Sequence, residues 1–188
     1  MLIRFTRAKR PDKPDVLTCV RQDGSSCWMH ERSGFVYHDL AHYAAETAFG
    51  YAYGFFGLVR SGWDLSAADF GRDPVTKERY PWPDPSGAPV EPVEYVVSLL
   101  QREARGHMVE DETVSASLAE TALDFYDAMR VYTGDTAPRL PEHQLSAARE
   151  RLRQLYTQWE QVAPSGCLEL TFTVAAASAV PTISGKEQ

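Results

Sequence analysis

One short segment constrains the fold more than any other part of the chain, because it gathers ionisable groups in apolar surroundings. His38, Asp39, His42 and Glu46 form the string H-D-L-A-H-Y-A-A-E. An α-helix turns by about 100° per residue, so the two histidines would lie about 40° apart, with both carboxylates within about 100° of His38. A helix over this segment would therefore present four groups able to bind a cation on one side.

The neighbours of these four residues leave the helix no solvated face. Alanine, leucine and tyrosine occupy the other positions of the string, and no lysine or arginine lies between Arg32 and Arg60. We therefore expect the helix to be buried. Two buried carboxylates without a basic partner are costly unless they are protonated or neutralised. A bound metal ion would neutralise them.

The rest of the chain predicts an α+β fold. Asp23-Gly24 is a strong hairpin signal. Alternating apolar and polar residues predict strands near 2–7 and 168–174, β-branched and apolar residues predict one near 16–20, and the hairpin turn predicts another near 26–29. The segment with the key string predicts a helix near 37–49, and apolar residues at helical spacing predict helices near 93–105, 113–132 and 143–162. We expect a small antiparallel sheet, made of an N-terminal meander plus a C-terminal strand, packed against four or five helices.

These elements define one expected domain over residues 1–174, followed by a tail at 175–188 that we expect to be disordered. Gly50 should end the key helix in a left-handed cap. The segment 51–59, rich in aromatics and glycines, is interpreted either as a short helix packed closely at its glycines or as a loop lining a pocket. Residues 71–92 hold six of the twelve prolines and should form a long loop, either a lid or a surface excursion.

Composition excludes several classes of function. The net charge of -7 offers no basic patch for nucleic acid or for an anionic membrane surface. The three cysteines are odd in number and form no C-x-x-C pair, so neither a disulfide framework nor a cysteine zinc site is indicated, and we interpret them as reduced core residues. No signal peptide or membrane-spanning stretch is evident, which favours a cytoplasmic location. A small molecule is the expected type of ligand, and the oligomeric state is left open.

Two histidines four residues apart on a helix can hold a divalent metal ion, with zinc as the first candidate. In the related motif H-E-x-x-H the glutamate polarises a metal-bound water, and Asp39 occupies that position here, one methylene shorter. Asp39 is accordingly the candidate catalytic residue, and His38, His42 and Glu46 are the candidate metal ligands. The ion could lie between the two histidines, or between His42 and Glu46. A further ligand would come from elsewhere, with His107, Glu120, Asp124 and Asp127 as candidates.

A metal-free interpretation remains alongside this one. His38, Asp39, His42 and Glu46 could satisfy one another by hydrogen bonds in a buried polar network of a structural or interaction protein. The two interpretations differ in whether the histidines adjoin a cavity. A metal enzyme would place His38, His42 and Glu46 beside a cavity walled by aromatic residues of 49–56, for metal-assisted chemistry on a small molecule.

The string also carries resemblances. Together with the hairpin turn before it and Gly54-Phe55-Phe56-Gly57-Leu58 after it, it resembles a family of uncharacterised bacterial proteins that share H-D-L-x-H-x-x-x-E and an aromatic-glycine segment. Its H-D-x-x-H core is similar to the zinc motif of a ubiquinone-biosynthesis protein family, which adds a glutamate twelve residues beyond the second histidine, where this chain has Gly54. The core also looks like that of HD-domain phosphohydrolases. The first two resemblances imply a metal site on this helix and name no reaction.

Overall fold

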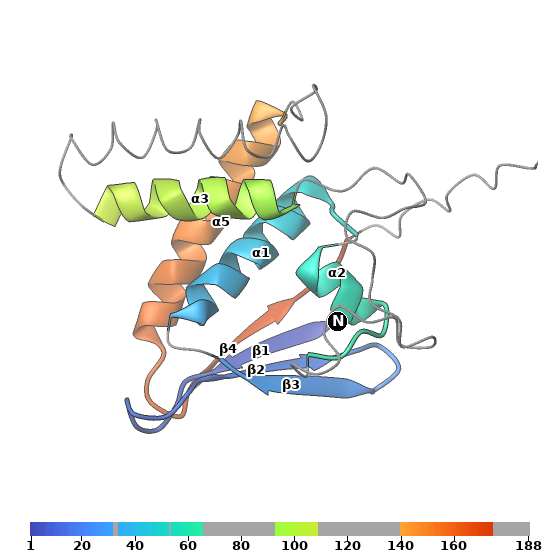
Figure 1. The fold of residues 1–188 in the computed structure, drawn as a ribbon, viewed down its shortest axis with the longest axis vertical. Coiled ribbons are helices and arrows are strands. Elements are labelled where there is room, and N and C mark those ends of the chain that lie inside the picture. The colour runs from blue at the N-terminus through green and yellow to red at the C-terminus, as the bar shows by residue number, and fades with distance from the viewer. Residues whose placement is uncertain (32–33, 53, 66–92, 109–139, 175–188) are drawn as a thin grey trace, which may run out of the picture.

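The computed structural model describes residues 1–31, 34–52, 54–65, 93–108 and 140–174. They form a four-stranded antiparallel sheet with helices on one side of it (Figure 1). The strands are β1 (Leu2–Thr6), β2 (Val16–Val20), β3 (Ser26–His30) and β4 (Cys167–Thr171), and the helices are α1 (Phe35–Phe49), α2 (Phe55–Arg60), α3 (Val93–Met108) and α5 (Glu142–Gln161). The expected α+β class is confirmed.

The sheet has the strand order β3-β2-β1-β4, so the last strand of the described residues lies beside the first, as expected. The turn between β2 and β3 is closed by a 2.8 Å hydrogen bond from the N–H of Arg21 to the carbonyl of Ser25. Gly24 takes a φ of 84° in this turn, a conformation that glycine adopts without strain. Alternate residues of β1 and β2 point inward, and Ile3 and Phe5 are fully buried.

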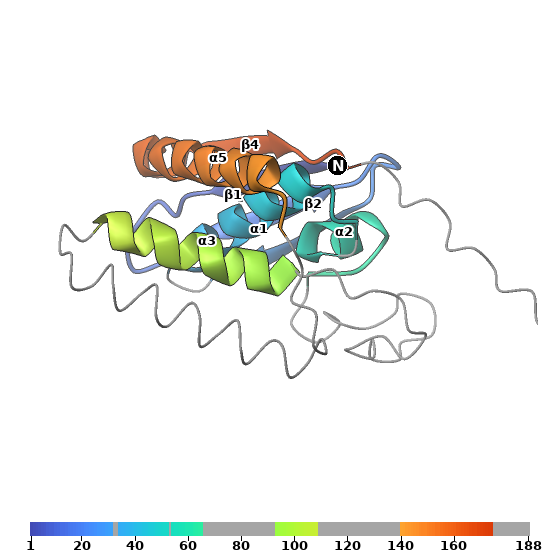
Figure 2. The same cartoon turned by 90° about the horizontal axis from the view of Figure 1, so that it is seen from above.

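Helix α1 lies in the middle of the helical layer, between α5 and α3 (Figure 2). It begins two residues before the expected start, and Gly50 ends it with a φ of 74°, as expected of a left-handed cap. Leu40, Ala41 and Ala44 are fully buried. The alanines allow α5 to approach the helix closely. Three polar residues of α1, Asp39, His42 and Glu46, are also buried.

Helix α2 follows α1 after a short turn. Of the two interpretations of 51–59, a short helix or a loop lining a pocket, the structure therefore supports the helix. A Cβ atom on Gly57 would lie 2.1 Å from the carbonyl oxygen of Ala52, so only glycine fits there. The glycines of this segment are therefore required by close packing.

Three expectations fall on residues outside the described ranges: the helix near 113–132, the proline-rich loop at 71–92 and the tail at 175–188. The domain boundary at residue 174 stays a prediction. Among the cysteines, Cys19 and Cys27 are buried, but Cys167 is exposed on β4, which corrects its placement in the core. Within the described part of the chain, none of the helices combines the length and apolar character needed to cross a bilayer.

Candidate metal centre

The imidazoles of His38 and His42 meet one turn apart on α1. Their Nε2 atoms lie 3.2 Å from each other, and their ring centroids are 4.7 Å apart. Residues four apart on a helix share a face, so the helical geometry alone brings these rings together. The predicted convergence of the two histidines is therefore present in the structure.

The opposite nitrogen of each ring has an oxygen partner. The Nδ1 atom of His38 lies 3.1 Å from Oε1 of Gln101 on α3, and the Nδ1 atom of His42 lies 3.3 Å from Oε1 of Glu46. An oxygen acceptor at Nδ1 favours the tautomer that carries its proton there. Both Nε2 atoms then present lone pairs to the same point.

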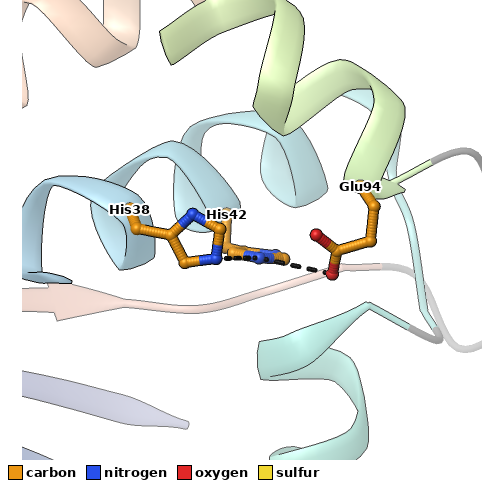
Figure 3. Close-up of side chains that lie close together, drawn as sticks. All are labelled: His38, His42 and Glu94. Carbon is orange, nitrogen blue, oxygen red and sulfur yellow. Dashed lines mark hydrogen bonds and ion pairs between the residues drawn. The ribbon is translucent and has the colours of Figure 1, made fainter. Parts of the chain in front are cut away.

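A carboxylate from a second helix completes the group. Glu94, in the first turn of α3, places Oε1 3.5 Å from Nε2 of His42 (Figure 3). One ligand atom from each of His38, His42 and Glu94 lies within 4.8 Å of the others. We call these three residues the histidine cluster. The cluster can hold a metal ion, because two imidazoles and a carboxylate are a common donor set for transition metals.

The cluster reaches the surface on one side. The Glu94 side chain is 53% exposed, whereas that of His42 is only 2% exposed. Phe35, itself exposed, lies edge-on to His38, and Phe55 lies at a ring-centroid distance of 5.5 Å from His42. The cluster therefore has apolar rings at its flanks and a solvent-facing carboxylate.

Burial keeps His42 neutral near physiological pH. The loss of solvation lowers the pKa of its imidazole to about 4; the Glu94 carboxylate acts to raise it, and His38 lowers it further. A neutral imidazole is the form that binds metals.

Glu46 lies at the Nδ1 side of the His42 ring, away from His38 and Glu94. Its Oε1 accepts a 3.2 Å hydrogen bond from the N–H of Phe56, and its Oε2 accepts a 2.9 Å bond from the N–H of Gly57. These are N–H groups of the first turn of α2, which have no acceptor inside the helix. The structure thus brings Glu46 to His42 and α2 but not to His38. Its role as a ligand stays a prediction, and the observed contacts make it the residue that orients His42.

The turn before α2 accommodates this carboxylate only because position 54 lacks a side chain. A Cβ atom on Gly54 would lie 2.3 Å from the carboxyl carbon of Glu46. Glu46 is itself fully buried. Its carboxylate therefore occupies the space that any other residue at position 54 would need.

Asp39 faces a different neighbour. It is 3% exposed and pairs with Glu31, which follows β3 and is 2% exposed. Burial raises the pKa of Asp39 well above its usual range, and the charge of Glu31 and a hydrogen bond with it raise the pKa further. Burial also raises the pKa of Glu31, and the bond from Asp39 opposes that rise. We call these two residues the acid pair.

The acid pair is deficient in partners. Apart from the bond between the two acids, the described residues supply no hydrogen-bond partner to Oδ2 of Asp39 or to either carboxylate oxygen of Glu31, and all three atoms are buried. Two adjacent buried carboxyl groups avoid this deficit when one retains its proton and donates it to the other. The structure does not bring Asp39 into the histidine cluster, and its catalytic role stays a prediction.

Sequence reasoning missed Glu94, Gln101 and Glu31. Glu94 and Gln101 belong to a helix that was expected, but polar residues on an amphipathic helix usually face solvent, and the chain holds many of them. A usable signal was the absence of any basic residue near the string, which implied that partners must come from other elements. His107, Glu120, Asp124 and Asp127, the candidates for a further ligand, have side chains outside the described part of the structure.

Comparison with known proteins adds no assignment, because no protein-family model, no curated protein and no solved structure matches the chain.

Proposed function

We propose that the protein binds a divalent metal ion, zinc, through His38, His42 and Glu94, and that the ion supports chemistry on a small molecule. The observation that carries the proposal is the arrangement of the two rings. Both hold oxygen acceptors at Nδ1, and their Nε2 atoms face each other and a carboxylate. Lone pairs that converge in this way repel one another unless a cation or a proton lies between them.

The distances suit a tetrahedral ion. For Zn–N bonds of about 2.05 Å, a separation of 3.2 Å between the Nε2 atoms corresponds to an N–Zn–N angle of about 103°. With a Zn–O bond of about 2.1 Å, the 3.5 Å between His42 and Glu94 corresponds to an angle of about 115°. The two angles lie on either side of the tetrahedral value of about 109°. The Glu94 side chain is half exposed, so it can rotate and bring a carboxylate oxygen nearer to Nε2 of His38.

The partners at Nδ1 support the same proposal. Metal-binding histidines usually donate their other ring N–H to a carboxylate or amide oxygen, which fixes the ring and raises its basicity. Glu46 serves His42 in this way, and Gln101 serves His38. A solvated surface pair of histidines would not need such partners.

Three protein ligands leave one tetrahedral position open. Catalytic zinc sites typically combine three protein ligands with one water, whose pKa the ion lowers to about 7. The exposed side of Glu94 gives that position access to solvent, and Phe35 and Phe55 offer apolar surfaces to a small ligand. Hydrolysis of a small ester or amide is the simplest reaction for this arrangement. The resemblance to H-D-x-x-H zinc motifs supports the metal ion and does not bear on the reaction.

One experiment tests the metal directly. Protein purified without a histidine tag should contain about one zinc per chain by elemental analysis, and a chelator should lower its melting temperature, because an ion bound only to the folded state stabilises it by mass action. The His38→Ala/His42→Ala double variant should contain none. Glu169→Gln, on an exposed acid of β4, is the matched control and should retain the metal. Metal-free protein whose melting temperature does not rise on addition of zinc would refute the proposal.

A second candidate function is purely structural, and it rests on the hydrogen bonds of the Glu46 carboxylate. Its carboxylate joins His42 to two N–H groups of α2, so these residues could serve only to hold α1 and α2 together. In that case the melting temperature of the wild type itself would be insensitive to zinc and to chelator, and His38→Ala would change neither response. Glu46→Ala would still destabilise the protein, because two buried N–H groups would lose their acceptor.

A further inference from the structure

Cys19 and Cys27 face each other across two strands beneath the helical layer. They are register partners on β2 and β3, and both side chains point into the core. Along two antiparallel strands, pairs that exchange backbone hydrogen bonds alternate with pairs that do not. The hydrogen bond from Arg21 to Ser25 therefore implies that Cys19 and Cys27, two residues further along each strand, are also a hydrogen-bonded pair. Cα atoms in such pairs lie about 5.5 Å apart, within the span of about 4.4–6.8 Å that a disulfide bridges. Both cysteines are free thiols in the structure.

The surroundings of the two sulfur atoms differ. Nη2 of Arg21 lies 3.5 Å from Sγ of Cys27, and the backbone N–H of Leu65 also donates to this sulfur. The guanidinium of Arg21 is held in place by the carbonyl oxygens of Val59 and Trp63, at 2.6 and 2.5 Å. Fixed donors and a positive charge favour a thiolate over a thiol.

Cys19 acts as the proton donor of the pair. Its hydrogen bond to Cys27 is the largest influence that lowers the pKa of Cys27, to about 6, with Leu65 and Arg21 in the same direction and Asp64 and burial opposed. The same bond and burial raise the pKa of Cys19, and Asp39 adds to the rise. The pair therefore combines a nucleophilic sulfur with a second thiol in contact with it.

We propose that Cys27 and Cys19 form a peroxide-reactive thiol pair that closes to a cross-strand disulfide between β2 and β3. The Cys27 thiolate attacks one oxygen of hydrogen peroxide, the O–O bond breaks, and hydroxide leaves as the sulfur becomes a sulfenic acid. The Cys19 sulfur then attacks the Cys27 sulfur, and the S–O bond breaks. The departing hydroxide takes the Cys19 proton and leaves as water. Overall, two thiols are oxidised, and one peroxide is reduced to two waters.

The order of the two steps follows from exposure. Cys27 is 5% exposed and Cys19 is fully buried, so a small oxidant reaches Cys27 first. The exposed Cys167 on β4 lies outside this pair and would give a separate signal. It is therefore best replaced in the test protein.

The test uses the full chain carrying Cys167→Ser, treated with hydrogen peroxide and examined by intact-mass spectrometry. We expect the loss of two hydrogen atoms, a peptide cross-link between residues 19 and 27, and full reversal by dithiothreitol. Cys19→Ala in the same background should stop at a sulfenic acid that dimedone traps at Cys27. Cys27→Ala should show neither product.

Two results would overturn the proposal. One is a Cys167→Ser protein whose mass stays unchanged at peroxide concentrations that oxidise Cys167 in the wild type. The other is oxidation of Cys27 to sulfinic acid with no cross-link to Cys19. Circular dichroism of each variant checks that it is folded. If an alanine variant fails to fold, the cross-link measurement in the Cys167→Ser protein still decides the question.

Discussion

Helix α1 bears two polar groups on neighbouring faces, and they differ in how their charges are compensated. The histidine cluster has partners at both outer nitrogens and reaches solvent through Glu94. The acid pair lies between α1 and the sheet, and both of its residues are nearly sealed from solvent. The histidine cluster is therefore arranged around a point that is accessible to solvent, whereas the acid pair is buried.

The difference indicates what each group can hold. An ion needs several converging ligands and a path to solvent, which the histidine cluster has. A proton needs only two adjacent oxygens, which the acid pair has. A helix without lysine or arginine can thus neutralise its acids in two ways at once, by a proton on the sheet side and, in our proposal, by a metal ion on the side of α3.

The largest effect should come from removing a ligand of the histidine cluster. His42→Ala deletes the ring that faces both other ligands, so zinc affinity should fall by more than about 100-fold, the upper end of what loss of an orienting partner costs. Titration with a competing chromophoric chelator measures this. Asp39→Asn, on the enclosed side of the same helix, serves as the comparison and should leave zinc affinity within a few-fold of the wild type. Equal losses in both variants would contradict the separation of the two groups.

A smaller loss of zinc affinity should follow from Glu46→Gln. The amide oxygen can still accept from one of the two N–H groups of α2, but the amide NH2 cannot accept from the other, and the negative charge that holds the Nδ1 proton of His42 is removed. We expect zinc affinity to fall by about 10- to 100-fold while the helix content by circular dichroism stays the same. An unchanged affinity would mean that Glu46 acts on the fold alone.

The acid pair should respond to pH in stability rather than in metal binding. The pKa of Asp39 is raised in the folded state, so folded protein keeps a proton that the unfolded chain loses above about pH 4. The free energy of unfolding of the wild type should therefore decrease as pH rises from about 4 through the raised pKa.

Asp39→Asn removes this penalty. At pH 8 the variant should be more stable than the wild type by about 1 kcal/mol or more, since each unit by which folding raises the pKa of Asp39 costs about 1.4 kcal/mol above that pKa. The gain should shrink toward pH 4. Urea unfolding across this range tests the expectation, and Glu31→Gln should behave in the same direction. Parallel pH profiles for wild type and variants would refute a shared proton.

The smallest effect is expected from Gln101→Leu. Gln101 supports His38 through a neutral amide oxygen, which is a weaker partner than a carboxylate. Zinc affinity should fall by less than about tenfold, below the usual effect of an orienting carboxylate. Isothermal titration calorimetry with zinc can measure this loss of affinity and compare it with the loss in Glu46→Gln. A loss larger than that of Glu46→Gln would show that His38, and not His42, depends most on its support.

Local patterns in the sequence predicted much of the fold. Strand alternation, the Asp23-Gly24 turn and the Gly50 cap are short-range signals, and each appears where it was expected. The convergence of His38 and His42 is also local, because it depends only on helical periodicity. What the sequence could not supply was long-range: which face of α3 meets α1, and so the parts played by Glu94 and Gln101. The same limit hid Glu31, whose partner is chosen by the packing of α1 on the sheet.

The close approach of Gly54 to Glu46 has a consequence for how this site can vary between proteins. A side chain at position 54 and a glutamate at position 46 compete for one volume, so the two positions cannot change independently. A chain that carried an acid at position 54 would need a small residue at 46, and the carboxylate would then reach the same region from the turn instead of from the helix. Sequences sharing this architecture should therefore exchange the acid between two positions while keeping its place in space.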